Sequence, residues 1–378
     1  MGCAQMLTKG ILGAAIGLAA AVGLVPGALA QSDAGAGPNP AKAPHASAAP
    51  AEMPLYPVVR RAQAPRSTVY SLIALPGSHT SGLLEGLAID RAGNIFVGEL
   101  DGRVIRITPK GEWSVYATFD LRHDQGAGAH LVGLAVDGQD RLYVVLDTHD
   151  APGKPRHGVW RINADGRAEF LASVPDVRGD VNQVTLDRYG NIYLTDSTLG
   201  LIWKVAPGRT MASLWFQDKR ILPAKLVGNP CNVPNALSWG VNGIAFGPDG
   251  DLFVSSGGQG TLLRVKIDPR TGTPAQVSEF IHDCKRLTGM DQIAVDQAGA
   301  VYIARNFENQ IVRVTPERKI EVLATESDGL DIPANISFGP GNATFGSVDQ
   351  ERRFLYVTNI RGRDVKVLDV GVPGMPMP

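Results

Sequence analysis

Four residues with oxygen-bearing side chains stand at equivalent positions of a repeated unit, where together they could bind one divalent cation. They are Glu85, Asn182, Asn242 and Asp291. Two carboxylates match the charge of a 2+ ion, and two carboxamides add neutral oxygen ligands. Because no His or Cys occupies this position, Ca²⁺ suits the set best, ahead of Mg²⁺ or Mn²⁺, with Zn²⁺ as a further candidate.

The repeated unit consists of an apolar strand, a turn that often reads Asp-x-x-Gly, and a second strand rich in aromatic and β-branched residues. One copy is Met290–Asp296 followed by Val301–Ala304. Six copies begin roughly 43 to 60 residues apart, a period that is typical of propellers. The residues at the heads of the copies are Glu85, Val132, Asn182, Asn242, Asp291 and Ala334. Since the first strand of each blade lines the central channel, we expect the heads to form a ring at one mouth.

Four short strands joined by tight turns fit into residues 86–119, which is the length of one propeller blade. The last copy is one strand short, and an additional strand, Val69–Leu75, precedes the first copy. A closed ring hides sheet edges better than an open one. We therefore predict an all-β fold, a six-bladed β-propeller over residues 67–372, whose ring is closed by the N-terminal strand completing the last blade.

The N-terminus has the pattern of a targeting sequence. Lys9 is followed by an apolar run over residues 11–25 and by Ala28-Leu29-Ala30, which predicts a secretory signal peptide over residues 1–30. A membrane anchor is the alternative, but the run is short for a span and contains glycines. Residues 31–66 are predicted to be a disordered linker rich in Ala and Pro. The expected location is periplasmic or secreted.

Composition limits the kinds of partner. The chain has 44% hydrophobic residues, 19% charged residues and a net charge of −1, so nothing favours nucleic acid or, after signal cleavage, a membrane surface. We expect a monomer acting on a small-molecule substrate, a lactone or ester. Cys231 and Cys284 both precede a repeat head, and neighbouring blades bring such loops together. A disulfide is the favoured interpretation, and two separate buried thiols are the alternative.

The metal interpretation also has a structural alternative, because Asn and Asp are common in turns and at strand starts. Four such residues in register favour the metal. His130, two residues before a head, and Asn335, directly after one, are candidates for substrate contact; a solvated loop position is the alternative for the histidine. The insertions at 147–157 and 218–240 are expected to form a lid or substrate wall.

Residues 67–370 resemble the senescence-marker-protein/gluconolactonase/luciferin-regenerating-enzyme-like family of calcium-dependent propeller hydrolases. The family heads read E-G-P, P-N-D, x-N-G and P-D-G. Here the corresponding tripeptides are Glu85-Gly86-Leu87, Val181-Asn182-Gln183, Val241-Asn242-Gly243 and Met290-Asp291-Gln292. The resemblance implies that Glu85, Asn182, Asn242 and Asp291 are the metal ligands, and that lactones, or in some members phosphotriesters, are hydrolysed. Gln183 and Gln292 depart from the family pattern beside the ligands.

These observations suggest a catalytic role for Asp291 as general base or nucleophile and for Glu85 as a charge-bearing ligand. Two other classes of function remain open. One is a non-catalytic propeller that binds a ligand or a protein, since fold alone does not decide function. The other is a strictosidine-synthase-like or lyase enzyme on the same scaffold, which would be expected to use His or Glu bases in place of a metal ring.

Overall fold

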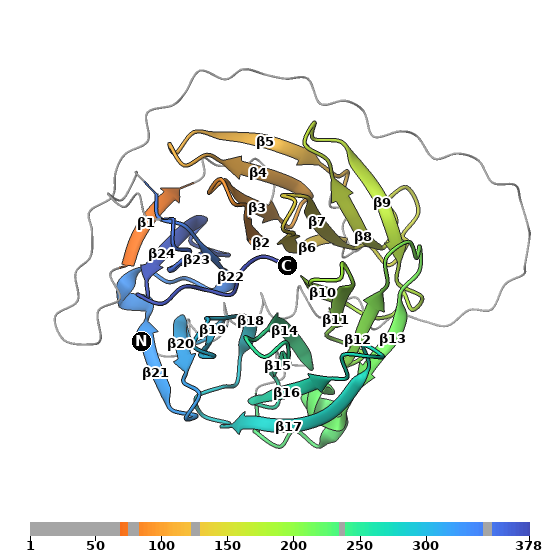
Figure 1. Ribbon diagram of the computed structural model, residues 1–378, viewed down its shortest axis with the longest axis vertical. Coiled ribbons are helices and arrows are strands. Elements are labelled where there is room, and N and C mark those ends of the chain that lie inside the picture. The colour runs from red at the N-terminus through yellow and green to blue at the C-terminus, as the bar shows by residue number, and fades with distance from the viewer. Residues whose placement is uncertain (1–68, 75–82, 122–128, 234–238, 343–349) are drawn as a thin grey trace, which may run out of the picture.

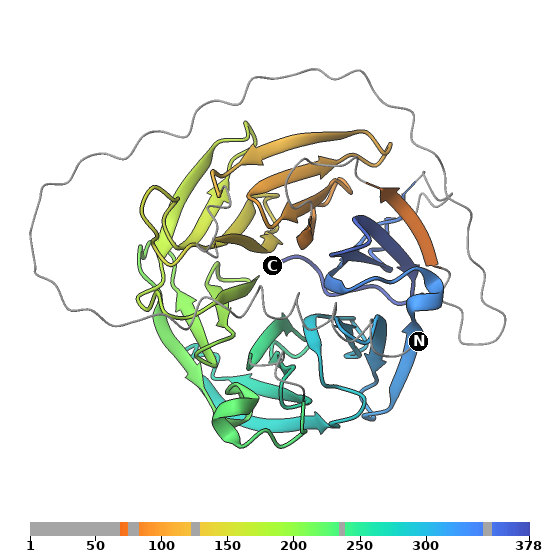
Figure 2. The same ribbon diagram turned by 180° about the vertical axis from the view of Figure 1, so that it is seen from behind.

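Six four-stranded antiparallel sheets stand around one axis, and this confirms the predicted six-bladed β-propeller (Figures 1 and 2). The computed structural model describes residues 69–74, 83–121, 129–233, 239–342 and 350–378. The predicted signal peptide (1–30) and linker (31–66) lie outside the described residues. Within these ranges no helix has the length and apolarity needed to span a membrane.

Each blade runs from an inner strand at the axis to an outer strand at the rim. The first blade contains β2 (Leu84–Ile89), β3 (Ile95–Glu99), β4 (Arg103–Ile107) and β5 (Trp113–Thr118). The second contains β6 (His130–Val136), β7 (Leu142–Asp147), β8 (Gly158–Ile162) and β9 (Ala168–Ser173). The third contains β10 (Val181–Leu186), β11 (Ile192–Asp196), β12 (Leu201–Val205) and β13 (Ser213–Gln217).

The remaining blades follow the same order. The fourth contains β14 (Val241–Phe246), β15 (Leu252–Ser256), β16 (Thr261–Ile267) and β17 (Pro274–His282). The fifth contains β18 (Met290–Val295), β19 (Val301–Arg305), β20 (Gln310–Val314) and β21 (Ile320–Ala324). The sixth contains β22 (Pro333–Gly339), β23 (Phe354–Asn359), β24 (Asp364–Asp369) and β1 (Val69–Ala74). In this sheet β1 pairs antiparallel with β24, and Val69 lies opposite Leu368. Short 3₁₀ helices lie in the loops: η2 (Lys219–Ile221), η3 (Ala224–Val227) and η4 (Glu326–Asp328).

The hydrophobic core is divided into clusters that neighbouring blades share. Leu87 and Val97 of the first blade pack in one cluster with Tyr356 and Val365 of the sixth. Corresponding clusters join blades one and two, two and three, three and four, four and five, and five and six. Because each cluster takes side chains from two blades, blade-to-blade packing fixes where the inner strands lie around the axis.

Aspartates hold the turn that follows several inner strands. Asp90 Oδ1 accepts a hydrogen bond from the backbone N–H of Asn94 at 2.8 Å, and Asp137 Oδ1 accepts one from Arg141 at 3.0 Å. The same bond recurs at Asp187. A side chain that caps a tight turn in this way explains why the repeat carries Asp at this position.

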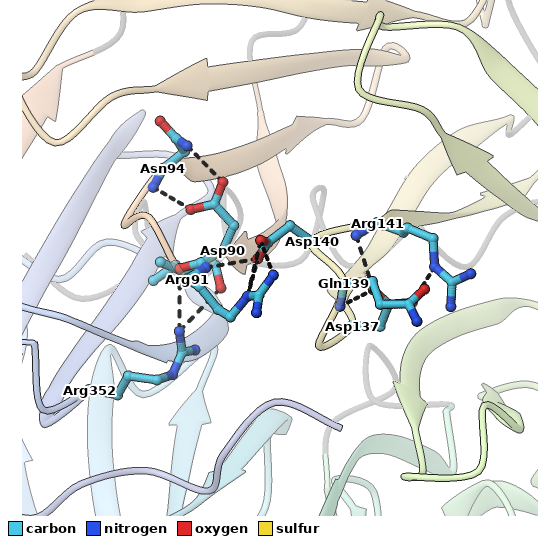
Figure 3. A network of polar contacts seen from close by, with 9 residues as sticks. Asp90, Arg91, Asn94, Asp137, Gln139, Asp140, Arg141 and Arg352 are labelled. Carbon is cyan, nitrogen blue, oxygen red and sulfur yellow. Dashed lines mark hydrogen bonds and ion pairs between the residues drawn. The ribbon is translucent and has the colours of Figure 1, made fainter.

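The turns of blades one, two and six are also linked to one another (Figure 3). Arg91 Nη2 lies 2.8 Å from Asp140 Oδ2, which joins the first turn of blade one to that of blade two. Arg352 Nη1 donates to the backbone carbonyls of Ile89 and Asp90, each at 3.4 Å. These contacts lie at the end of the channel opposite the predicted ring of heads.

The inner strands approach each other closely where glycine follows the head residue. A Cβ atom on Gly86 would lie 2.5 Å from the carbonyl oxygen of Val132, and one on Gly243 would lie 2.5 Å from that of Asp291. Neighbouring backbones therefore come together at these points only because the side chain is missing. The requirement explains the Glu-Gly and Asn-Gly pairs at the heads of blades one and four.

A cavity of about 870 Å³ occupies the channel. Its wall includes the apolar centres of the inner strands, Leu87, Leu134, Val184, Ile244, Ile293 and Ile336. The C-terminal residues Met375–Pro378 also line it, and the C-terminus lies at the centre of the ring (Figure 1). Gly138 N donates to the Pro378 carbonyl at 2.6 Å, and Met375 N donates to that of Val295 at 3.0 Å. The tail thus crosses the mouth of the channel opposite the heads.

Candidate metal centre

The four predicted ligands occupy the same place in four inner strands. Glu85, Asn182, Asn242 and Asp291 are each the second residue of their strand, in β2, β10, β14 and β18. Glu85, Asn242 and Asp291 are buried, and Asn182 is partly buried. None of the four lines the 870 Å³ cavity, so the candidate centre lies at the mouth beyond its wall.

The two carboxylates are close enough to affect each other. Burial, together with the nearby charge of Asp291, raises the pKa of Glu85 well above its usual value. Burial also raises the pKa of Asp291, although hydrogen bonds from Asn306 and Asn242 oppose this shift. Because burial is the main cause of both shifts, negative charge in this mouth is unfavourable without a positive partner.

Asn306 Nδ2 donates to Asp291 Oδ2 at 3.0 Å, and Asn242 also donates to this carboxylate. Both amides thereby turn their N–H groups toward Asp291 and keep their oxygens free. Among the described residues, the buried Oδ1 atoms of Asn182, Asn242 and Asp291 have no hydrogen-bond partner. Leaving such atoms unpaired is costly. A set of free oxygens with two carboxylates fits a hard divalent cation.

Asn306 is a site residue that the sequence reasoning missed. It follows β19, the second strand of blade five, whereas the repeat pattern marks only the heads of first strands. Its buried side chain meets Asp291 because the top of the second strand lies beside the start of the first, as the pairing of Met290 with Arg305 shows. Polar residues recur at the ends of second strands, for example Glu99 and Asp196. This recurrence could have indicated that second strands also contribute side chains to the mouth.

Below the heads, polar side chains cross the channel. Asn335 Nδ2 donates to Gln183 Oε1 at 3.0 Å, and both side chains are fully buried. Gln292 Oε1 accepts from the backbone N–H groups of Ile293 and Ile244. The two glutamines that depart from the family pattern thus form hydrogen bonds inside the channel. Asn335, predicted to contact substrate, lies in this inner layer.

The histidines near the ends of the blades lie in different places. His130 begins β6 and is paired with Asp147 of β7, at the mouth that carries the heads. His282 ends β17, where its Nδ1 lies 2.9 Å from the Thr261 hydroxyl. His79 and His123 lie outside the described residues.

Cys231 and Cys284 form a disulfide, as the sequence predicted. The bond connects the loop before blade four, which contains η2 and η3, with the segment that follows blade four. Within this loop, Val233 and Ala224 form a small cluster with the partly buried Trp239 and with Phe307 of blade five. The described part of the long loop predicted at 218–240 is therefore held by the disulfide and by this cluster.

The buried carboxyl group of Asp196 should make the stability of the protein depend on pH. Burial raises the pKa of Asp196 to about 6, against hydrogen bonds from the Leu199 N–H and the Trp203 indole. Since the pKa is higher in the folded state than in the unfolded chain, the free energy of unfolding should fall as pH rises from about 4 to about 6. This difference between the folded and unfolded pKa of Asp196 lowers the free energy of unfolding by about 3 kcal/mol. In denaturant titrations, Asp196→Asn should remove most of this fall, and equal pH profiles for both proteins would contradict the assignment.

Comparisons with known proteins agree with the fold and with the family that the head tripeptides resemble. The chain matches the model of the SMP-30/Gluconolactonase/LRE-like region over residues 123–361, more than half of its length. No curated protein matches it in sequence. Among solved structures, the calcium-binding protein regucalcin from Agrobacterium tumefaciens is 19% identical, with a TM-score of 0.59 over 82% of this chain and 95% of that chain.

Two other structures share the architecture. A gluconolactonase from Xanthomonas campestris is 18% identical, with a TM-score of 0.55 over 86% of this chain and 97% of that chain. Virginiamycin B lyase from Staphylococcus aureus is 13% identical, with a TM-score of 0.52 over 81% of this chain and all of that chain (100%). At these identities the structures establish the propeller fold. The family model covers three of the four predicted ligand positions, and by this match the chain belongs to the SMP-30/gluconolactonase/LRE-like family.

Proposed function

We propose that the protein is a metal-dependent hydrolase of the lactonase type that uses Ca²⁺. The observation that carries the proposal is the group of unpaired oxygens around the buried Glu85 and Asp291 at one mouth of the propeller. Family membership and the likeness to a gluconolactonase support the reaction class, and the likeness to a calcium-binding regucalcin supports the ion.

Glu85, Asn182, Asn242 and Asp291 would hold the ion. When bound, Ca²⁺ supplies a Lewis acid that polarises the lactone carbonyl and stabilises the oxyanion. Asp291 is oriented by Asn306 and has a second oxygen without a hydrogen-bond donor among the described residues. In the proposed reaction Asp291 accepts a proton from the attacking water as the new C–O bond forms. The alkoxide released when the ring C–O bond breaks takes up a proton, which gives the open hydroxy acid.

The tail at residues 375–378 crosses the opposite mouth, so substrate would enter from the mouth that carries the heads. A secreted or periplasmic location is proposed from the N-terminal sequence, and the Cys231–Cys284 disulfide is compatible with an oxidising compartment. We propose that the protein acts as a monomer on a small lactone or ester.

The test is a panel of aldonolactones, aliphatic lactones and aryl esters, assayed with protein freed of metal by a chelator. We expect turnover of at least one lactone to fall about a hundredfold after chelation and to return when Ca²⁺ is added, in preference to Mg²⁺, Mn²⁺ or Zn²⁺. Lactone hydrolysis that is indifferent to chelation would contradict the metal mechanism. Calcium binding without turnover of any substrate would support the non-catalytic alternative.

A further inference from the structure

A second group of ionisable residues lies at the same mouth, between blades two and three, apart from the four head ligands. Asp147 ends β7, His149 follows it, and Asp180 directly precedes β10. One potential ligand atom from each of these three residues lies within 4.8 Å of the other two. The proposed lactonase chemistry does not use them.

The His149 ring is oriented by a backbone carbonyl. Its Nδ1 lies 2.8 Å from the Val177 carbonyl oxygen, which can only accept a hydrogen bond, so Nδ1 carries a proton. The other ring nitrogen, Nε2, lies 3.8 Å from Asp180 Oδ1. The second oxygen of Asp180 accepts a hydrogen bond from the Thr198 hydroxyl. Metal-binding histidines are commonly held in this way, with one ring N–H donating to a carbonyl, and the contact leaves Nε2 without a proton on the side of Asp180.

Asp147 provides a second, independent observation. Its side chain is only 7% exposed, and its Oδ1 lies 3.3 Å from Nδ1 of the fully buried His157. That nitrogen accepts hydrogen bonds from the backbone N–H groups of Thr148 and His149, so it has no proton to donate. The Nδ1 proton of His149 points to Val177, because the distance to Asp147 Oδ1 is longer, at 3.6 Å. Within the described part of the chain, Asp147 Oδ1 therefore has no donor.

A buried carboxylate oxygen without a donor, in a group that also contains Asp180, calls for a cation. The ligand chemistry differs from that of the head residues, because an imidazole nitrogen joins two carboxylates. Such a mixed set favours a first-row transition metal over Ca²⁺. Three protein ligands would also leave a coordination position for water or for a ligand entering this mouth.

We propose that Asp147, His149 and Asp180 form a second metal site, which binds a divalent transition metal of the Zn²⁺ class. It is independent of the proposed Ca²⁺ site, although Asp180 lies only two residues before Asn182. The loop over residues 148–157 contains His149 and forms one wall of this second site. His157 supports this wall from within, and Asp150 Oδ1 accepts a hydrogen bond from its backbone N–H at 2.8 Å.

The experiment measures Zn²⁺ binding by calorimetry to the full-length protein kept in saturating Ca²⁺, with Co²⁺ absorption in the visible range as a second readout. Reductant is left out, because reduced Cys231 and Cys284 would form a thiolate site with His282. The main variant is His149→Asn, since His149 has a φ of 49° and Asn tolerates this left-handed conformation. Asp180→Asn is the second variant, and His282→Asn is the matched control.

We expect one Zn²⁺ per chain in the wild type, about a hundredfold weaker binding in both site variants, and unchanged binding in the control. Absence of a Zn²⁺ equivalent in the wild type, which would mean a His–Asp ion pair only, would overturn the proposal. Equal affinity in a correctly folded His149→Asn or Asp180→Asn protein would overturn it as well. Because Asp291→Asn should lose Ca²⁺ and keep Zn²⁺, failure of this site can be told apart from failure of the lactonase proposal.

Discussion

Replacing Asp291 by Asn is expected to lower Ca²⁺-dependent turnover by about two to three orders of magnitude while making the metal-free protein more stable. The two effects have opposite signs for one physical reason. Burial raises the pKa of Asp291, and the pKa of the neighbouring Glu85 is raised as well, so without a cation both charged carboxylates destabilise the fold. Asn removes one of these charges, and with it the attraction for the ion.

The sign of the pH dependence follows from the same shifts. In the metal-free wild type, carboxyl pKa values that are higher in the folded state than in the unfolded chain make the free energy of unfolding fall as pH rises above about 4. Asp291→Asn should flatten this fall. Added Ca²⁺ should stabilise the wild type through mass action and have little effect on the variant. Thermal unfolding of both proteins, in chelator and in Ca²⁺, at pH 5 and pH 8, measures the pH dependence and the Ca²⁺ stabilisation of each.

Asp296→Asn is the matched control, because Asp296 directly follows the other end of the same strand. Asp296 Oδ1 accepts from Ala300 N at 2.9 Å, and its Oδ2 accepts from the Tyr302 hydroxyl at 3.1 Å. Losing one of these acceptors should cost about 1 to 3 kcal/mol and leave Ca²⁺ binding intact. Full turnover by a folded Asp291→Asn protein would remove Asp291 from the mechanism.

The architecture could be predicted from the sequence because the fold repeats. Strand, turn and strand recur with Asp at the turn, and one periodic pattern therefore indicates many equivalent positions. The same periodicity placed Glu85, Asn182, Asn242 and Asp291 at one level of the channel. It also made the glycines after Glu85 and Asn242 informative, since the backbones approach closely there.

Other parts of the mouth could not be found in this way. Asn306, His149 and Asp180 lie in loops or beside strand ends, and each approaches its partner through turn geometry that differs from blade to blade. His149 and Asp150 both have φ values near 50°, which no repeat pattern encodes. The contact between Gln183 and Asn335 joins blades three and six across the channel, between residues 152 positions apart in the chain. A contact of this kind can be identified only from the assembled ring, because no local sequence pattern links its two residues.

Replacing both Cys231 and Cys284 by Ser is expected to lower the free energy of unfolding by about 4 kcal/mol. The two cysteines are 53 residues apart, and a crosslink over such a loop restricts the unfolded chain by roughly this amount. The loop encloses all of blade four, β14 to β17, so the bond limits the separation of that blade from its neighbours in the unfolded state.

Guanidinium titrations of the wild type with and without reductant, and of the double variant, measure this effect. Reductant should bring the wild type to the stability of the variant and leave the variant unchanged. The folded state offers little to replace the bond locally, because the cluster that the loop forms is small and consists of Val233 and Ala224 with the partly buried Trp239 and Phe307. We therefore expect Trp239, whose ring stacks on Phe307, to become more accessible to a fluorescence quencher even before global unfolding. Equal stability of oxidised and reduced protein would mean that the blade-to-blade cores alone hold blade four in the ring.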